Sequence, residues 1–199
     1  TLTQNKKVIA GTSLDYDAAT IGINNSIGAG STVDIDATGG TTIAEAGDIT
    51  ASGAVTFGAN KSGTLTTSGD IDTSNDNVTF TRGVTLGGAV DIDTGTGAGN
   101  IVFNSTVATA DKNLSLDAGA SGNITLSGAL TGGGVLTVRD GKAQSYQALT
   151  VDSLDIQDAT TSVTLDGALT TQTTLDINSG GTLTQNKKVI AGTSLDYDA

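Results

Sequence analysis

Short apolar–polar–apolar triplets recur along the whole chain at intervals of about twenty residues. Alternation with a period of two is typical of a strand that buries one face. Gly, Asn or Ser follows most of the triplets, so each strand is expected to be short. The clearest triplets end at Tyr16, Ile35, Phe57, Phe80, Ile92, Leu116, Val138, Ile156, Ile177 and Tyr197.

Further short apolar strands lie between these markers, for example at 21–23, 49–51 and 124–126. About three short strands per twenty residues predict a solenoid, in which each coil stacks on the one before at about 4.8 Å. We therefore expect an all-β, right-handed parallel β-solenoid (β-helix) with about nine coils of about 20 residues per 181-residue period. The step from Phe80 to Ile92 is only 12 residues, so either one coil is short or the marker moves to a different strand of the coil.

Two other architectures compete with the solenoid. Asp140-Gly141 and Asp166-Gly167 could form hairpin turns, which would favour an antiparallel sandwich. The absence of Pro and Trp and the shortness of the strands speak against that fold. Disorder is common in acidic, Gly-rich chains, but the apolar residues recur too regularly for it. A single Glu and no Met disfavour helix.

The first eighteen residues, Thr1–Ala18, are identical to the last eighteen, Thr182–Ala199, at an offset of 181. We interpret 1–181 as one full tandem repeat of a continuous β-solenoid and 182–199 as the start of the next identical repeat. Further copies of the same repeat are then the expected partners, end to end, in a covalent array or in a polymer. Nine coils at the strand spacing predict an axial repeat of roughly 43 Å.

The composition excludes several classes of function. A formal net charge of −12 argues against nucleic-acid binding, which requires a basic surface. No apolar run approaches the roughly 20 residues of a membrane helix, so membrane insertion is not expected. The chain contains no His and no Cys, which are the commonest catalytic bases and nucleophiles. Paired carboxylates could hydrolyse glycosides, but with only three Tyr and three Phe the chain lacks the aromatic platforms of sugar sites. We do not expect an enzyme.

Aspartates occupy the outward middle position of many marker triplets and the position directly after the triplet. Stacked carboxylates repel one another unless cations or hydrogen bonds intervene, and Ca²⁺ prefers such oxygen ligands. The pattern predicts calcium between adjacent coils, although a solvated acidic face interrupted by Thr and Ser explains it as well. The candidate ligands are Asp15, Asp17, Asp34, Asp36, Asp91 and Asp93.

Two sets of residues are expected to form structural ladders rather than binding sites. Asn77, Asn100 and Asn123 each precede an apolar strand, where inward amides could stack and satisfy one another. Phe57 and Phe80 lie one coil apart and could stack in the same way.

The Cys-free coils rich in Gly, Asn, Asp and Thr, built on "NITLSGAL" (123–130) and "SVTLDGAL" (162–169), resemble the β-helical stalks of large bacterial exoproteins. These are the filamentous-haemagglutinin-like adhesins of two-partner secretion and the autotransporter passengers. The resemblance covers the whole chain and is one of composition. It implies a right-handed parallel β-helix, an extracellular or cell-surface location, and contact with a host or neighbouring cell.

The sequence thus predicts a structural segment of a long, secreted, repetitive surface protein or filament, such as an adhesin stalk or extracellular fibre. The alternative is a Ca²⁺-dependent or carbohydrate-binding module that uses the Asp-bearing face of the solenoid.

Overall fold

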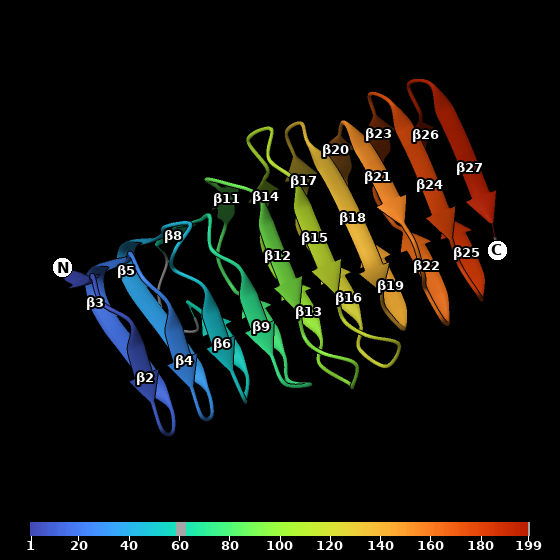
Figure 1. Cartoon of the computed structure of the whole chain (residues 1–199). Coiled ribbons are helices and arrows are strands. Elements are labelled where there is room, and N and C mark those ends of the chain that lie inside the picture. Colours follow the sequence, from blue (N-terminus) through green and yellow to red (C-terminus); the bar gives the residue numbers. More distant parts are fainter. Residues whose placement is uncertain (59–62, 199) are drawn as a thin grey trace.

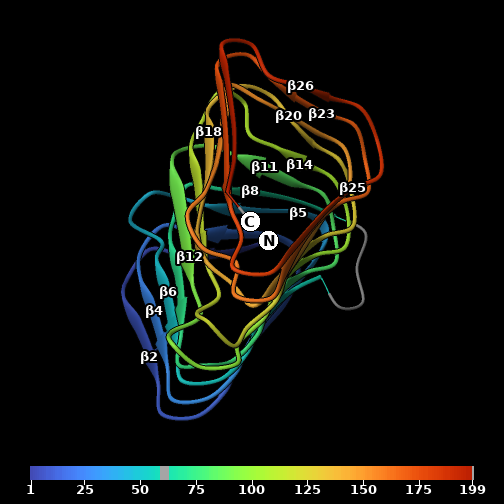
Figure 2. The ribbon, with the colours of Figure 1, turned by 90° about the vertical axis from the view of Figure 1, so that its right-hand side faces the viewer.

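The computed structural model describes residues 1–58 and 63–198, which form a right-handed parallel β-solenoid of about ten turns (Figures 1 and 2). These residues contain strands and turns but no helix. Each strand pairs in parallel with its equivalents one coil away, as Val78 does with Val55 and with Ile101. The predicted solenoid is confirmed and the antiparallel sandwich is wrong. Asp140-Gly141 and Asp166-Gly167 lie where the chain turns from one side of the coil to the next rather than in hairpins.

Each coil contributes one strand to each of three faces. Face 1 is a separate ten-stranded sheet, at the front of Figure 1. It consists of β2 (Val8–Ala10), β4 (Ile27–Ala29), β6 (Ile49–Ala51), β9 (Ile71–Thr73), β12 (Val90–Asp93), β15 (Leu114–Asp117), β18 (Val135–Asp140), β21 (Ser153–Ile156), β24 (Thr174–Asn178) and β27 (Ser194–Asp198).

Faces 2 and 3 form one seventeen-stranded sheet because β3 (Leu14–Ile23) and β5 (Val33–Ile43) are long enough to run around the corner between them. The register of this pair shifts between Ala18 and Thr20, where the strands bend. Face 2 consists of 14–18, 33–37, β7 (Val55–Phe57), β10 (Val78–Phe80), β13 (Ile101–Phe103), β16 (Ile124–Leu126), β19 (Ala143–Tyr146), β22 (Ser162–Leu165) and β25 (Thr182–Gln185). Face 3 consists of β1 (Leu2–Gln4), 21–23, 41–43, β8 (Thr64–Thr67), β11 (Val84–Leu86), β14 (Val107–Ala108), β17 (Leu130–Thr131), β20 (Leu149–Val151), β23 (Leu169–Thr171) and β26 (Val189–Ile190).

The inward side chains of the three faces form one continuous apolar core. The alternation read from the sequence decides which residues enter it, since successive side chains of a strand point to opposite sides. Eight residues predicted to lie inside are at most 1% exposed: Val33, Ile35, Leu114, Leu116, Leu154, Ile156, Leu175 and Ile177. Leu14 and Tyr16, also predicted inside, are partly buried and pack against this core.

The short step between Phe80 and Ile92 is a change of face. The first four marker triplets, ending at Tyr16 to Phe80, lie on face 2, whereas those from Ile92 onward lie on face 1. The second of the two explanations, that the marker moves to a different strand of the coil, is therefore confirmed. Every coil keeps three strands across this point, because β11 lies between β10 and β12.

Replacing Ile35 with Asp should unfold the coils around β5 and leave distant coils protected. Ile35 is 0% exposed, and an unpartnered buried charge costs about 3–5 kcal/mol. Solenoid contacts are mainly between neighbouring coils, so the damage should stay local. Amide hydrogen exchange would show loss of protection near β5 and retention near β21.

The matched control is Thr79→Asp, which places the same charge at an outward position of the same face. It should leave amide protection nearly unchanged. A loss of protection spread evenly from β1 to β27 in the Ile35→Asp variant would contradict this locality.

Candidate functional site

The aspartates that were predicted to share one face of the solenoid are divided between two faces. On face 2, Asp15 pairs with Asp34 and Asp17 pairs with Asp36, so the structure brings these four together on neighbouring strands. Asp91 and Asp93 lie elsewhere, on face 1. The division has the same cause as the 12-residue step, since the marker triplet changes face between β10 and β12.

Face 1 carries two columns of outward polar residues. In one, Asp72, Asp93 and Asp117 follow one another in register, with Asp140 next beyond an irregularity. The other runs from β12 to β27 as Asp91, Ser115, Thr137, Asp155, Asp176 and Asp196. Like charges directly opposite on neighbouring strands repel, so these columns need compensation.

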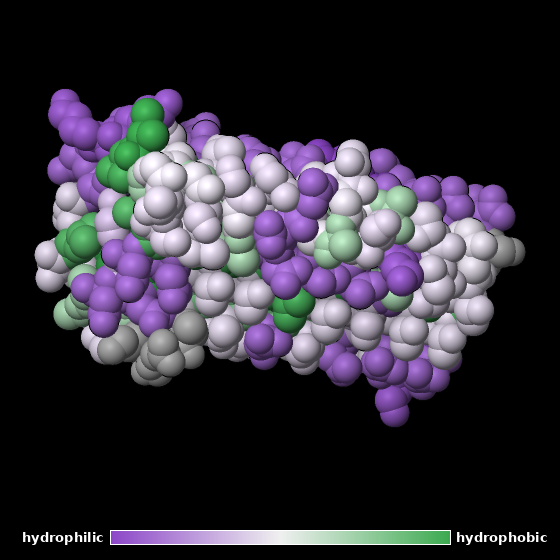
Figure 3. Space-filling view, turned by 90° about the horizontal axis from the view of Figure 1, so that it is seen from below, coloured by the Kyte–Doolittle hydropathy of each residue, from purple (hydrophilic) through white to green (hydrophobic). Residues whose placement is uncertain are grey.

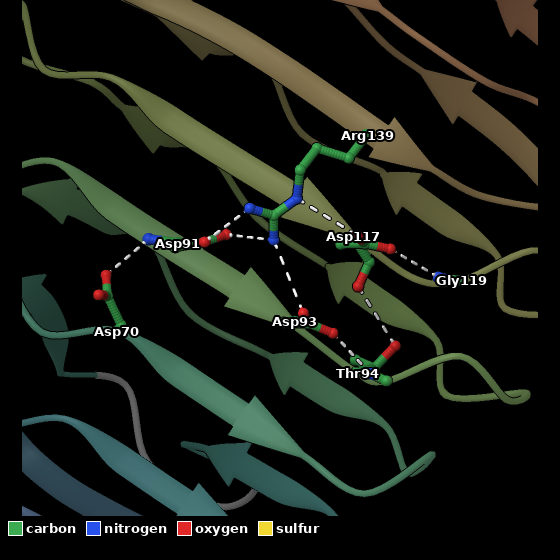
Figure 4. A network of polar contacts seen from close by, with 8 residues as sticks. Asp70, Asp91, Asp93, Thr94, Asp117, Gly119 and Arg139 are labelled. Carbon is green, nitrogen blue, oxygen red and sulfur yellow. Dashed lines mark hydrogen bonds and ion pairs between the residues drawn. The ribbon is translucent and has the colours of Figure 1, made fainter.

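The guanidinium of Arg139, on β18, lies among three carboxylates of face 1 (Figure 4). Its Nη1 and Nη2 donate to the two oxygens of Asp91 at 2.8 and 2.9 Å, and its Nε donates to Asp117 Oδ2 at 3.2 Å. Nη2 also lies 3.7 Å from Asp93 Oδ2. Such bidentate, charge-assisted bonds are among the stronger polar contacts in proteins. Arg139 therefore connects three successive strands, β12, β15 and β18.

The surrounding carboxylates stabilise the protonated form of Arg139. Burial alone would lower the pKa of Arg139, but the hydrogen bond to Asp91 and the charges of Asp91, Asp117 and Asp93 outweigh it and raise the pKa above its ordinary value. The side chain thus supplies a permanent cation beside Asp91 and Asp93, two of the aspartates predicted to bind Ca²⁺ between coils.

The same carboxylates also hold backbone turns. Asp93 Oδ1 accepts from Gly95 N at 2.6 Å, and Asp117 Oδ1 accepts from Gly119 N at 3.0 Å. Both glycines have positive φ, 79° and 61°, which only glycine adopts at little cost. A carboxylate that accepts from the backbone two residues on is a common turn device. Asp93 and Asp117 therefore each hold a turn with Oδ1 while Oδ2 faces Arg139.

A second arginine, between β10 and β11, performs a similar role beside face 2. Arg82 is 5% exposed and Asp36 is 6% exposed, and their side chains approach to 3.6 Å between Nη2 and Oδ1. Arg82 also donates to the carbonyl oxygens of Ala37 at 3.3 Å and Ile35 at 3.4 Å. Gly58 leaves the room for this side chain, because a Cβ there would lie 2.0 Å from Arg82 Nε.

Burial lowers the pKa of Arg82, and the charges of Asp36 and Asp34 oppose that shift. Burial raises the pKa of Asp34, to which the charges of Asp36 and Asp15 add. Burial likewise raises the pKa of Asp72, followed by the charges of Asp93 and Asp91. Burial, and after it the crowding of carboxylates, thus makes ionisation of Asp34 and Asp72 less favourable in the folded chain.

Three of the six predicted calcium ligands, Asp36, Asp91 and Asp93, form ion pairs with an arginine. In the described ranges, no three His, Cys, Asp or Glu side chains are grouped so as to hold a metal ion. Calcium binding at the six aspartates stays a prediction, which the experiment under Proposed function tests.

The predicted aromatic ladder is present and longer than expected. The rings of Phe57 and Phe80 stack with centroids 5.0 Å apart and planes within 4°, and Phe80 stacks on Phe103 at 4.4 Å and 5°. Leu126 and Tyr146 continue the same row.

The asparagine ladder is present in part, since Asn77 and Asn100 bond through their side-chain amides and Asn123 joins through its backbone N–H, and its predicted inward orientation is wrong. Asn100 Nδ2 donates to Asn77 Oδ1 at 2.9 Å, and Asn123 N donates to Asn100 Oδ1 at 2.8 Å. All these contacts are exposed. Each Asn directly precedes an inward residue such as Val78, so strand alternation turns it outward.

Comparison with protein families, with curated proteins and with solved structures found no match. The resemblance to adhesin stalks therefore stays a prediction. Among the described residues, no helix is long and apolar enough to cross a membrane.

The arginines are the site residues that sequence reasoning missed. The chain has nine Lys and Arg against 21 Asp and Glu, and Arg82 and Arg139 are the two arginines among them. Each reaches an aspartate two coils back, 46 and 48 residues away in the sequence. That separation becomes meaningful only when the coil register is known.

Replacing Arg139 with Met should lower the free energy of unfolding by about 1–2 kcal/mol, after allowance for solvent screening. The apolar stem remains, but three carboxylates lose their shared cation. Added NaCl should recover part of the loss by screening their repulsion. Urea unfolding of both proteins at low and high salt measures the effect.

Arg139→Lys is the matched variant, because it keeps the charge but not the bidentate geometry. Its stability should fall between those of the wild type and Arg139→Met. Equal stability of all three proteins at low salt would show that the network contributes nothing.

Acidification from about pH 7 toward pH 4 should add stability through Asp34 and Asp72. Their pKa values are raised in the folded chain, so it holds these protons more tightly than the unfolded chain does. This stabilisation is complete below the unfolded pKa near ~4 and is lost as the pH rises through the folded values. Asp72→Asn should therefore flatten the dependence of urea unfolding on pH. An unchanged slope would contradict the assignment.

Proposed function

We propose that this chain is a structural segment of a longer repetitive protein, a rod that sets distance and stiffness. The observation that carries the proposal is how the second copy of the repeated sequence packs. Its strands continue all three faces in register, with Val163 opposite Leu183 on face 2, Leu169 opposite Val189 on face 3 and Leu175 opposite Leu195 on face 1. The start of one repeat is thus one more coil on the end of the preceding repeat.

Internal neutralisation of the acidic columns supports the same function. The arginines bind carboxylates of their own chain, and Asp93 and Asp117 hold turns. These groups stabilise the rod itself. The resemblance to adhesin stalks supports an extracellular or cell-surface location, with further copies of the repeat as the covalent neighbours.

A cation-binding surface is the second candidate, and one observation favours it. Asp155, Asp176 and Asp196 stack in register on three successive strands of face 1. Burial and then the charges of Asp155, Asp196 and Asp198 raise the pKa of Asp176. A divalent ion would relieve this repulsion.

The two candidates differ in how calcium affects stability. For a structural rod, we expect the thermal midpoint of the wild type to be the same in CaCl₂, in MgCl₂ and in NaCl of equal ionic strength. Arg139→Met should instead gain stability in CaCl₂, because it exposes the three carboxylates that Arg139 occupies. Circular dichroism melting measures both proteins.

The Arg139→Met protein is the internal control for the sensitivity of the assay. A rise in the wild-type midpoint that is specific to CaCl₂ would favour the cation-binding module. Small-angle scattering provides the second criterion, since a compact particle in place of an elongated one would contradict the rod.

A further inference from the structure

The two identical segments of the chain do not lie on the same faces. Residues 2–4 lie on face 3, but their copy, β25, lies on face 2. Residues 8–10 lie on face 1 and their copy, β26, on face 3. Residues 14–18 lie on face 2 and their copy, β27, on face 1. Each strand of the second copy is displaced by one face of the coil.

The strand count explains this displacement. On face 3, β1 and β23 are separated by eight complete coils. The strands β24 and β25 then add two thirds of a coil before the repeated sequence starts again. One 181-residue period is therefore eight and two-thirds coils rather than a whole number.

The repeated sequence fits either set of faces because its alternation is unchanged and most equivalent side chains point inward in both copies. The exception is Leu195, 54% exposed in the last coil, whose counterpart Leu14 packs against the core. Leu2 and Leu183, Val8 and Val189, and Tyr16 and Tyr197 are all partly buried against the core. The outward isoleucine between them is exposed in both copies, 76% for Ile9 and 44% for Ile190. In a solenoid, each coil contacts mainly its neighbours, so a rotated stack preserves every contact within the repeat.

We infer that successive 181-residue repeats are related by a screw operation that turns each repeat by one face, in addition to the gradual twist of the sheets visible in Figure 2. This inference rests on the proposed function, because it concerns a rod in which the repeat is continued. The original orientation returns after three repeats, or 26 coils, which is about 125 Å at 4.8 Å per coil.

The inference determines how a long rod presents its surface. The Arg139 cluster lies on face 1 in this repeat and would lie on face 3 in the next and on face 2 in the third. Hydrophilic and hydrophobic outward groups, such as those that Figure 3 shows on one side of the molecule, would follow a helical path around the rod. A neighbouring rod or ligand that recognises one set of outward residues would find that set on each of the three sides of the rod, once every three repeats.

The whole chain has no native cysteine, so pairs of introduced cysteines labelled with pyrene report which strands are neighbours. Asp176→Cys with Asp196→Cys should give strong excimer emission, since these residues are in register on face 1. Thr164→Cys with Thr184→Cys should do the same on face 2. If the period were eight whole coils, Asp196 would lie on face 2, as Asp15 does, next to Thr164, and Thr164→Cys with Asp196→Cys would give the excimer instead. If it were nine, with the added strand after β24, Asp196 would lie on face 2 two coils from Thr164, and neither of the first two pairs would emit.

We expect emission from the first two pairs and at most a tenth of that intensity from the third. Emission mainly from the third pair would overturn the screw relation. Absence of emission from both register pairs, in chains that scattering shows to be elongated, would overturn it as well while leaving the proposed rod intact. A compact particle would instead contradict the rod. The Thr164 and Thr184 pair, which removes no charge, keeps the test valid where the aspartate pair fails to fold.

Discussion

The stacking of equivalent residues in register from one coil to the next is the constraint on which the rest of this structure depends. Parallel strands place each side chain directly over its counterpart, which for inward residues gives continuous apolar rows such as Phe57, Phe80 and Phe103. The same geometry places each outward aspartate next to the residue at the equivalent position of the neighbouring coil, which in several coils is another aspartate. Stacking that stabilises the core therefore concentrates like charge on the surface.

Two arginines resolve this conflict where it is sharpest. Arg139 occupies the centre of three carboxylates on face 1, and Arg82 is buried beside Asp36 on face 2. Both are suited to the position because a guanidinium binds carboxylates and carbonyls through several fixed donors at once. Where no arginine is present, as at Asp176, burial and then the charges of neighbouring aspartates raise the pKa of the carboxyl group. The acidic surface is thus compatible with the fold because its charge is partly neutralised from within.

The fold could be predicted from the sequence because alternation and a period of about twenty residues are local signals. They assign Ile35 or Leu154 to the core without any knowledge of the other strands. Alternation carries no information about the face, however, since a triplet such as Val33–Ile35 reads like Val90–Ile92 although the two lie on different faces. The sequence therefore predicts one Asp-bearing face where the structure has two, and it does not identify the partners of Arg82 and Arg139. The register of the whole coil decides these pairs.

The arginine contacts also bear on how the rod would yield under tension. In a stack joined only between adjacent coils, pulling on one end would peel the coils away singly, each at a similar force. Arg139 ties β18 to β12, so the coil that carries it cannot leave before a contact two coils deeper breaks. Arg82 has the same effect, because it ties the coil that follows β10 to β5. Coils bridged by Arg82 or Arg139 would thus separate together, and the other coils would separate one at a time. The two arginines act as mechanical clamps of the rod.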